Sequence, residues 1–584
     1  MGKVGRIALT FVVVLGAAAL IAWAASYVSP LTPRASEEWS RGRVIGTSSV
    51  NRPVALCPAP PGGVYLVWSN ADDRLELARI DPSGRVVFDQ VLAVSEKGRD
   101  PQLRVDGAGR LHLLWREEGD GSIRYVLLDP EGGVLQGPQT LSETMDGRPS
   151  APRLIQDAVG DFHALWVDAD GVQWALIEPD GGVMARQTLF AVDATTIAAQ
   201  MDRDGYLHLA WQRASGANKQ SIEYAVFVPE TGDLAGPERL AEVFLRMGQR
   251  VDGPTLGLDL DTAYVLWVVE DLREISSEAQ YAYFLIGLPQ ERRVETIQLE
   301  RGRDPTGVAP LEGQRSPLLV ALSEVARSES GRMEPQIALL ALVRDQMPDF
   351  RIVGPSEARS IDVLSLLALG PGGGVAWAAD PGWSPILGAE TEHIVTASDR
   401  PSLRPTIAAD AYFDLHLAWL EPGGFGRYRV VYASTASGVK QAYNAITPWD
   451  LADQFFSLLM RLSLVALAIG PMTILWALLP LTALAFYYLV SSEEDLRARG
   501  PRLMLGGVLL LEVVLTFIFP PHGQPMGPAF RWGVPAGAAV VAGAVTVLFV
   551  RRREGNALFL AFFVFTAIDM LLQLLLYFAV FGLN

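Results

Sequence analysis

A short string of residues recurs along the middle of this 584-residue chain and constrains its fold more than any other feature. Four segments place a His three residues before a Trp in an otherwise apolar run, and each has an Asp nine residues before the Trp. The recurring residues are His112, Trp115, His163, Trp166, His208, Trp211, His416 and Trp419, preceded by Asp106, Asp157, Asp202 and Asp410. Self-similarity at a nearly fixed period indicates a repeat architecture.

Each repeat reads as strands and turns, with no helical period. After Trp115, a polar turn at 117–121 is followed by an apolar strand at 123–128 and then by the turn Asp129–Gly133. Comparable Pro- and Gly-containing turns recur at the same place in other repeats; Pro presets φ and Gly accepts the positive φ that closes a hairpin. We therefore predict four short antiparallel strands in each repeat.

The spacing of the repeats predicts an all-β propeller. Trp residues stand at 68, 115, 166, 211, 267, 377 and 419, with intervals of 42–56 residues apart from one gap of 110. Units of this size match propeller blades, and the long gap fits two blades, one without its Trp near Leu318–Leu322. We count eight blades; seven blades with an insertion at 300–357 is the alternative.

The repeated His and Asp residues allow two interpretations. In the strand Leu111–Trp115, His112 and Leu114 point to one face and the other three side chains to the opposite face, which suits a strand buried between neighbouring blades. The pairs could be catalytic or bind metal, or they could hold each blade together through a buried hydrogen bond. Recurrence around the ring favours the structural role, and we assign no catalytic, cofactor or metal residue.

The string D-x-x-G-x-L-H-L-x-W resembles the degenerate repeats of sialidase-like (BNR-type) β-propeller proteins. The resemblance covers about 43–445 and implies the fold more than an activity. Active members carry S-x-D-x-G-x-T-W Asp-boxes, an arginine triad and a tyrosine–glutamate nucleophile pair, none of which can be matched to positions here. The resemblance therefore implies a propeller and leaves sialidase-like glycan hydrolysis as an alternative.

Charge divides the chain into unlike parts. The net charge is −17, and residues 30–450 alone contain 38 basic and 58 acidic residues. This acidity argues against nucleic-acid binding. Cys57, the single cysteine of the sequence, excludes an internal disulfide and a cysteine metal cluster.

Apolar runs at both ends predict a membrane protein. Residues 7–28 are long enough to cross a bilayer, and Lys3 and Arg6 before them place the N-terminus in the cytoplasm. We expect an uncleaved anchor in 1–29, a cleaved signal peptide being the alternative. Residues 30–446 then form the extracytoplasmic propeller.

Residues 447–584 contain four further apolar runs, at about 454–491, 503–520, 532–550 and 557–582. Basic residues between them, at 497–502 and 551–553, fit a cytoplasmic location only if the first run crosses once, with an interfacial helix near 450–468 leading into a span at 471–491. We predict a multi-pass protein of the plasma membrane, with one N-terminal and four C-terminal transmembrane helices.

Polar residues within these runs are candidates for contacts inside the membrane: Arg461, Glu512, Asp569 and Gln573. Intramembrane acids are costly and need a partner or a water-filled path. Contacts between helices, contacts with a partner subunit and a proton or ion path are the three interpretations, in that order of preference.

Interruptions of the repeat indicate binding loops at 268–280, 323–335 and 380–392, because loops between blade strands form propeller binding faces. Trp383 in the third could stack on a sugar or an apolar partner, or cap the neighbouring blade.

Our leading hypothesis is an extracytoplasmic binding or scaffolding module without cofactors that engages an extracellular protein or glycan and docks a membrane-protein partner. The alternatives are a diverged, membrane-tethered glycan hydrolase and a transport-related membrane domain with a propeller lid.

Overall fold

A computed structural model describes residues 38–142, 150–271, 273, 276–299, 303–310, 316–327, 333–354, 361–367, 374–379, 385–387, 392–395, 402–445, 448, 452, 476–518, 528–551 and 557–581. The chain separates into two compact units, one of which is Arg34–Ala445 and the other of which contains the helices after Ile446. The predicted N-terminal anchor at 7–28 and the interfacial helix near 450–468 lie outside the described residues, apart from Ala452.

Within the described residues, strand pairing gives eight four-stranded antiparallel sheets, which we number as blades 1 to 8. Blades 1 to 7 are β2–β5, β6–β9, β10–β13, β14–β17, β18–β21, β22–β25 and β26–β29, and blade 8 is β30–β32 with β1 at its outer edge. The expectation of four-stranded antiparallel repeats is confirmed, and blade 6, around Leu318–Leu322, is the repeat without a Trp.

The strands have the following bounds: β1 Arg43–Ser48, β2 Ala55–Pro58, β3 Val64–Ser69, β4 Leu75–Ile80, β5 Val86–Val91, β6 Gly98–Val105, β7 Leu111–Glu117, β8 Ile123–Leu128, β9 Val134–Thr140, β10 Arg153–Gln156, β11 Phe162–Asp168, β12 Gly171–Ile177, β13 Val183–Phe190, β14 Ala194–Met201, β15 Leu207–Gly216, β16 Lys219–Val228, β17 Asp233–Phe244, β18 Gln249–Leu258, β19 Thr262–Asp271, β20 Ser276–Leu285, β21 Arg293–Thr296, β22 Arg303–Pro310, β23 Leu318–Arg327, β24 Met333–Leu342, β25 Asp349–Gly354, β26 Ile361–Leu367, β27 Gly374–Ala379, β28 Pro385–Leu387, β29 Glu392–Ile394, β30 Leu403–Ala409, β31 Leu415–Gly424 and β32 Arg427–Ser434. A short 3₁₀ helix, η1 (Pro289–Glu291), precedes β21.

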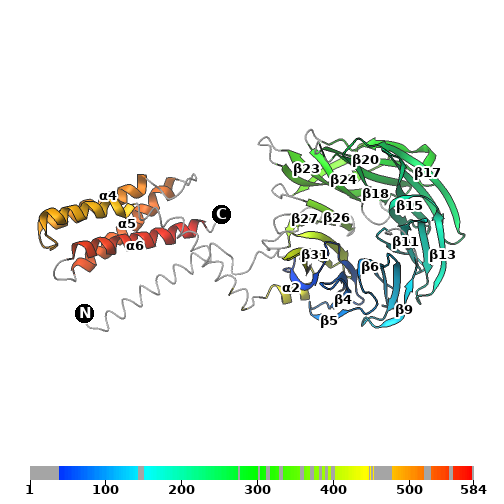
Figure 1. Cartoon of the computed structure of the whole chain (residues 1–584), viewed down its shortest axis with the longest axis horizontal. Coiled ribbons are helices and arrows are strands. Elements are labelled where there is room, and N and C mark those ends of the chain that lie inside the picture. The colour runs from blue at the N-terminus through cyan, green and yellow to red at the C-terminus, as the bar shows by residue number, and fades with distance from the viewer. Residues whose placement is uncertain are drawn as a thin grey trace. The chain divides into compact units, whose positions relative to one another are not determined.

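The blades form a closed ring, which Figure 1 shows from one end. The inner strand of each blade contacts that of the next, from β2 and β6 around to β30, which contacts β2 again. Blade 8 closes the ring by joining strands from the two ends of the unit, since β1 pairs with β32 from Arg43 opposite Tyr432 to Ser48 opposite Tyr428. The arrangement is that of a β-propeller.

Apolar cores lie between neighbouring blades. In β7, Leu113 and Trp115 pack against Val67 and Leu77 of blade 1, and all four are buried. Leu114, on the other face of the same strand, packs into the core shared with blade 3. The alternation read from the sequence therefore reflects a strand covered on both faces.

The two ends of each blade differ in the loops that they carry. One end carries the connections from one blade to the next and the turns between second and third strands, for example 92–97 and 118–122; we call it the rim face. The other carries the remaining turns, for example 106–110 and 129–133; we call it the turn face.

Both ends of the propeller chain meet on the turn face. Helix α2 (Ser437–Tyr443) follows β32 there, and Asn444 just after it binds the N-terminal segment. The Asn444 side chain accepts a hydrogen bond from the Arg41 backbone N–H at 2.7 Å and donates one to the Trp39 carbonyl at 3.3 Å.

The described helical unit consists of a helix at Trp476–Ser491, α4 (Arg499–Ile518), α5 (Pro528–Arg551) and α6 (Leu558–Phe581). These helices overlap the four predicted apolar runs, but α4 begins earlier than expected and takes up Arg499 and Arg502, which we had placed in a loop. Pro501 is compatible with this start, because the first helical turn needs no intrahelical N–H donor.

Among the described residues, one helix, Arg499–Ile518, is long and apolar enough to cross a membrane. The other apolar helical stretches, Trp476–Ser491, Pro535–Arg551 and Leu558–Gln573, are shorter. This finding falls short of the predicted multi-pass arrangement, whose remaining crossings stay a prediction.

Candidate functional site

The repeated histidines are buried and contact polar groups through both ring nitrogens. In blade 3, His163 Nδ1 accepts a hydrogen bond from Trp174 Nε1 at 3.1 Å, and its Nε2 lies 3.2 Å from Asp157 Oδ2. Because an indole N–H can only donate, Nδ1 is unprotonated and Nε2 donates to the aspartate. Each ring therefore connects a turn to the third strand of its blade.

A tyrosine replaces that tryptophan in three other blades. His112, His208 and His416 lie 2.8, 2.5 and 2.7 Å from the hydroxyls of Tyr125, Tyr224 and Tyr432. The Nε2–Asp distance is 3.0 Å for His208 and 3.6 and 3.4 Å for His112 and His416.

Burial keeps the rings of His112, His163 and His416 neutral. It lowers the pKa of His112 to about 4, against partial compensation by Asp106, and it also lowers the pKa of His163 and His416. Both ring nitrogens of His163 and His208 are bonded, which leaves no free position for a substrate or a metal, whereas in His112 and His416 the buried Nε2 faces its aspartate at 3.6 and 3.4 Å. The geometry is that of a hydrogen-bonded strut between strands.

Each repeated aspartate also closes its own turn. Asp202 Oδ1 accepts hydrogen bonds from the backbone N–H groups of Asp204 and Tyr206, at 3.0 and 2.8 Å, while Oδ2 faces His208. Burial raises the pKa of Asp202, but the hydrogen bonds from His208 and Tyr206 outweigh it, so the carboxyl pKa lies below its ordinary value. Throughout the described part of the chain, no group of three or more His, Cys, Asp or Glu side chains is placed to hold a metal ion.

A second set of carboxylates, near the rim face, was missed in the sequence. Trp115, Trp166 and Trp419 donate their indole N–H to Glu117, Asp168 and Glu421, two residues further on, at 2.9–3.2 Å. Glu117 also accepts from Ser95 Oγ at 2.8 Å and from the Lys97 backbone N–H, which fixes the connection between blades 1 and 2. The repeated Trp-x-acid spacing was the signal that could have revealed them.

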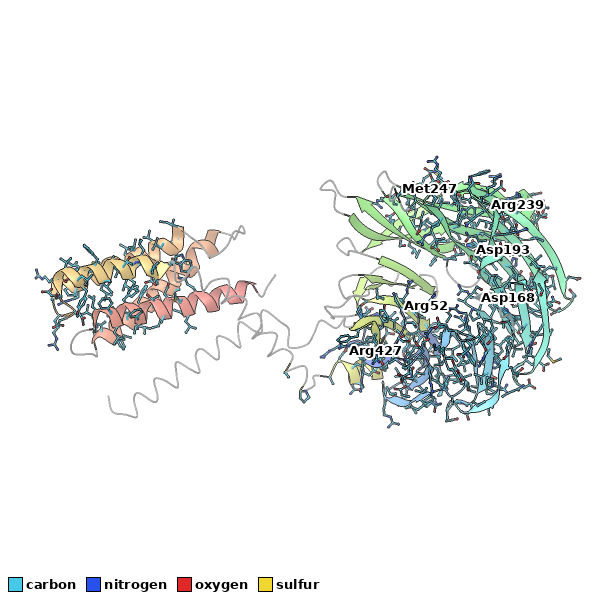
Figure 2. The ribbon with its side chains drawn as sticks, viewed as in Figure 1. Arg52, Asp168, Asp193, Arg239, Met247 and Arg427 are labelled. Atoms are coloured by element: carbon cyan, nitrogen blue, oxygen red, sulfur yellow. The ribbon has the colours of Figure 1, made fainter. Side chains whose placement is uncertain are left out.

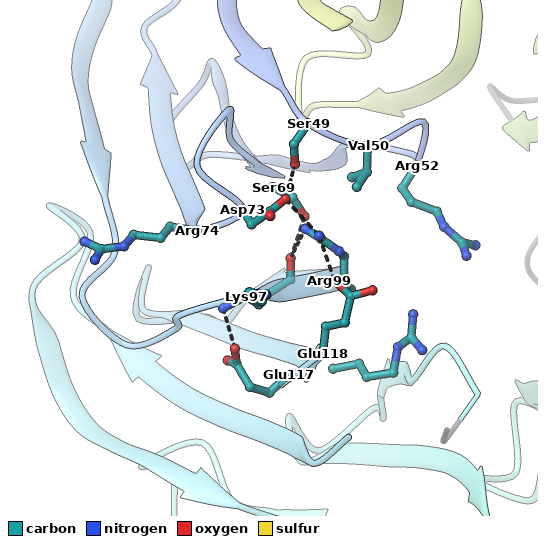
Figure 3. Close-up of polar contacts among 12 residues, drawn as sticks. Ser49, Val50, Arg52, Ser69, Asp73, Arg74, Lys97, Arg99, Glu117 and Glu118 are labelled. Atoms are coloured by element: carbon teal, nitrogen blue, oxygen red, sulfur yellow. Dashed lines mark hydrogen bonds and ion pairs between the residues drawn. The ribbon is translucent and has the colours of Figure 1, made fainter. Parts of the chain in front are cut away.

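Arginines and carboxylates gather at the rim face of blades 1 and 2 (Figure 3). Arg99, at the start of β6, lies between Asp73 and Glu118, with its Nη2 2.8 Å from each carboxylate. Asp73 also accepts from Ser49 Oγ at 2.6 Å, and this bond lowers the pKa of Asp73 against the effect of burial. The cluster ties three successive rim segments together.

Asp100 extends this cluster toward the middle of the ring. Arg116 Nη2 lies 2.9 Å from its carboxylate, and Arg52 Nε lies 3.7 Å from it. Arg52 is 56% exposed and lies near the middle of the ring (Figure 2). We call Arg52, Arg99, Arg116, Asp73, Asp100 and Glu118 the rim cluster.

The backbone beneath the rim cluster is irregular. Asp100 has φ of +52° immediately before Pro101, a conformation that is unfavourable for a residue preceding proline. The register of β6 against β7 shifts at this point, between Arg99 and Gln102. Bulges re-aim side chains, and strained residues held in place by their surroundings often mark functional sites.

Related arginine–carboxylate pairs occur in other blades. Arg250, in β18, pairs with Glu270, and Arg303, at the start of β22, lies 2.7 Å from the buried Glu324. The recurrence of Arg directly before Pro or Asp-Pro at the start of inner strands, as at Arg52 and Arg99, is a sequence signal that we overlooked. The pairs are therefore partly a blade feature, whereas blades 1 and 2 gather three arginines and three carboxylates, with Asp100 between Arg52 and Arg116.

Two of the predicted binding loops are extended strands instead. Residues 268–271 continue β19 and pair with 276–279 of β20, and β23 continues to Arg327 opposite Met333 of β24. Strand pairing satisfies backbone groups of the residues that pair, so these insertions lengthen two hairpins. The third interruption, 380–392, is described only at β28 (Pro385–Leu387) and Glu392, and Trp383 lies outside the described residues.

Tyrosine and glutamate do meet in blade 5, but away from the inner strands. Tyr281 and Tyr283 of β20 donate to Glu295 of the outer strand β21, at 2.9 and 3.1 Å. This position differs from the ring centre, where a propeller hydrolase of the type considered above would need its nucleophile pair.

Polar residues of the helical unit form a separate buried group. Glu512 of α4 accepts a hydrogen bond from Thr566 of α6 at 2.9 Å, and Asp569 accepts one from Gln573, four residues along the same helix, at 2.6 Å. All four side chains are buried. Arg461, the fourth polar residue singled out in the sequence, lies outside the described residues.

Comparison with known proteins leaves the family open. No protein-family model matches the chain, and no curated protein matches it in sequence. Among solved structures, a PL25 ulvan lyase is 9% identical over 61% of this chain and 93% of its own, with a TM-score of 0.41.

Two further structures show likenesses of the same order. An α-L-arabinanase of Penicillium chrysogenum is 11% identical over 48% of this chain and 92% of its own, with a TM-score of 0.33. A puromycin hydrolase is 15% identical over 64% and 59%, with a TM-score of 0.41. Likenesses this distant carry no argument here, so the propeller fold rests on strand pairing.

Proposed function

We propose that the propeller is the binding module of a membrane-anchored protein and that its rim face engages an extracytoplasmic protein. The observation that carries the proposal is the rim cluster, which gathers three arginines and three carboxylates from rim segments of blades 1 and 2 around the strained start of β6. Arg52 and Glu118 are about half exposed in this cluster, and exposed charges in a fixed arrangement select partners by complementary charge. The described buried His, Asp and Trp–acid pairs are accounted for by the blades themselves.

The position of the rim face supports this proposal. The two ends of the described propeller, at Trp39–Arg41 and Asn444, meet on the turn face, at the opposite end of the blades from the rim face. Phe425, in the turn between β31 and β32, is fully exposed there, and Met247, in the connection between blades 4 and 5, is largely exposed. Exposed aromatic and thioether side chains beside arginine are typical of protein interfaces.

The proposed anchoring has two supports. Helix α4 is long and apolar enough to span a bilayer, and basic residues flank the apolar helices at Arg497 and Arg551–Arg553. The positive-inside rule then places residues 30–450 outside the cytoplasmic membrane and the loop at 497–502 inside. A partner within the membrane would bind the helical unit.

Charge reversal tests the binding proposal directly. The full-length protein is purified in mild detergent as wild type, as Arg52→Glu and as the control Arg85→Glu, whose side chain is largely exposed on the turn face. We expect a protein that co-purifies with the wild type and Arg85→Glu to be lost about tenfold in Arg52→Glu. A lone, monodisperse protein in all three preparations, or equal losses in both variants, would refute the proposal.

Cysteine labelling tests the topology. Cys57 is buried, so introduced cysteines can be followed after Cys57→Ala. A membrane-impermeant maleimide added to intact cells should label Met247→Cys and leave Ala498→Cys unlabelled. Labelling of Ala498→Cys from outside would contradict the proposed orientation.

A second candidate, a glycan-acting enzyme, is favoured by one observation: the rim cluster combines arginines, which bind sugar carboxylates, with carboxyl groups such as Glu118 that could transfer protons. Release of reducing ends from acidic polysaccharides by the wild type, abolished in Glu118→Gln, would support it. If no reducing ends are released, the glycan-acting enzyme is refuted and the binding module stays the proposal.

A further inference from the structure

The buried polar group of the helical unit contains more hydrogen-bond acceptors than donors. Among the described residues, its buried polar side chains are those of Glu512, Thr516, Thr546, Thr566, Asp569 and Gln573. Thr516 and Thr546 donate their hydroxyls to backbone carbonyls of their own helices, at Val513 and Ala542. The donors left for the two carboxylates are therefore the Thr566 hydroxyl and the Gln573 amide.

Those two donors are already used, on Glu512 and on one oxygen of Asp569. The second carboxylate oxygen of Asp569 and the amide oxygen of Gln573 accept no hydrogen bond from any described residue. Both side chains are at least 98% buried, at 2% and 1% exposure. A buried acceptor without a hydrogen-bond donor lowers the stability of the fold, and a buried charge without a counter-charge lowers it further.

The two acids lie close together between α4 and α6. Thr566, which bonds Glu512, and Asp569 are three residues apart on α6 and therefore lie on the same face of that helix. Two carboxylates facing one buried space repel each other unless a positive charge joins them.

Among the side chains described as buried in the helical unit, none is basic. The buried titratable groups of the helical unit are Glu512 of α4 and Asp569 of α6. Helix α5 contributes the buried Thr546, and the helix Trp476–Ser491 contributes no buried charged side chain. Outside the buried group, the charged residues in or next to these helices are Glu493, Glu494, Asp495, Arg497, Arg499, Arg502, Arg531 and Arg551. The described contacts of Glu512 and Asp569 are with Thr566 and Gln573, and none of them is with an arginine or lysine.

We infer that Glu512, Asp569 and Gln573 form a binding site for a small, hard, exchangeable cation, either H⁺ or Na⁺, between α4 and α6. Carboxylate, amide and hydroxyl oxygens are the groups that bind such ions, and intramembrane acids commonly mark ion or proton sites. A proton on either carboxyl, or a sodium ion beside Asp569 and Gln573, supplies the missing positive partner. The inference is independent of what the propeller binds.

Infrared spectroscopy of the full-length protein in liposomes tests the site. The C=O stretch of a protonated carboxyl is recorded from about pH 5 to about pH 9, in NaCl and in choline chloride of equal ionic strength. Asp569→Asn and Glu512→Gln assign the band, and Thr546→Val, a buried hydroxyl that bonds only its own helix in the described contacts, is the matched control.

A proton site predicts a band that falls by more than half as the pH rises, in both salts, and is lost in Asp569→Asn or Glu512→Gln but not in Thr546→Val. A sodium site predicts that NaCl, and not choline chloride, shifts the carboxylate bands in the wild type and leaves those of Asp569→Asn unchanged. If these variants do not fold, Asp569→Glu retains the carboxyl and should shift the same band.

Two results would overturn the inference. One is a protonated carboxyl band that responds to neither pH nor sodium, which would indicate a static structural hydrogen bond. The other is the absence of a protonated band together with sodium-insensitive carboxylate bands, which an ion pair with Arg461 or another basic group would produce.

Discussion

The turn aspartate of blade 4 offers a sharp test of how the blades are held together. Asp202 accepts three hydrogen bonds: from the backbone N–H groups of Asp204 and Tyr206 and from the ring of His208. Asp202→Ala removes all three. The neighbouring Asp204→Ala is the matched control, because the Asp204 side chain is exposed in the same turn.

The cost of Asp202→Ala follows from these contacts. The two N–H groups lie in a turn that water can reach, so each lost bond should cost about 1 kcal/mol. The ring N–H of His208 is fully buried and loses its acceptor, which costs a further 1–3 kcal/mol or so. We expect a loss of about 3–4 kcal/mol for Asp202→Ala and less than about 0.5 kcal/mol for Asp204→Ala.

Asp202→Asn separates the stability contributed by the turn hydrogen bonds from that contributed by the contact with His208. The asparagine oxygen can still accept both backbone bonds, while its NH₂ group faces the His208 N–H and forces the other ring tautomer, so we expect a cost of about 1 kcal/mol. The assay is denaturant unfolding of the full-length protein in detergent, followed by tryptophan fluorescence. Equal stabilities of Asp202→Ala and Asp204→Ala would refute the strut that we assign to the repeated aspartates.

Three further predictions concern the same blades. Burial depresses the pKa of His112 from 6.5 to about 4, so the contribution of the neutral ring to stability is complete above about pH 6.5. This contribution should fall by about 3 kcal/mol as the pH drops through 4. His112→Gln should flatten this part of the stability–pH curve, and an unchanged curve would contradict the assignment. Glu117→Ala leaves the Trp115 indole and two other donors unpaired and should cost about 3–5 kcal/mol in denaturant unfolding, against about 1 kcal/mol for the more exposed Glu118→Ala. Gly171→Ala places a Cβ 2.0 Å from the Phe190 carbonyl oxygen at a φ of +117° and should lower the free energy of unfolding by about 2–4 kcal/mol. The control Gly205→Ala, at a φ of +83° with no atom within 4 Å of the new Cβ, should cost about 1 kcal/mol. Equal costs would show that the blade relaxes around residue 171.

The repeat was readable in the sequence because burial between blades imposes it. A strand covered on both faces must be apolar throughout, so the rare His among Leu and Trp stands out, and its partner Asp lies at a fixed distance across a hairpin. The same regularity allowed blade 6 to be counted at Leu318–Leu322 although Leu322 stands where Trp115 stands in blade 2. Such patterns can be predicted from the sequence because the contacts behind them join residues that are close along the chain.

The rim cluster could not be predicted in the same way, because its contacts join residues from separate blades. Arg99 meets Asp73 across 26 residues of sequence, and no periodicity selects that acid among the others of this acidic unit. The insertion at 268–280 was misread for a related reason: Glu270 and Asp271 look like loop residues, yet they pair with Ser277 and Ser276 at the exposed end of a hairpin. Edge positions of long hairpins carry no apolar signature.

Photo-crosslinking in intact cells tests most directly whether the rim face is the binding face. A photoreactive amino acid is introduced at Phe425, in the rim-face turn of blade 8, and separately at Met347, which is 92% exposed in a turn-face loop of blade 6. The proposal predicts a discrete crosslinked protein from position 425, lost when Arg52→Glu is added, and none from position 347. The same crosslinked protein from position 347, or crosslinking at 425 that ignores Arg52→Glu, would contradict it.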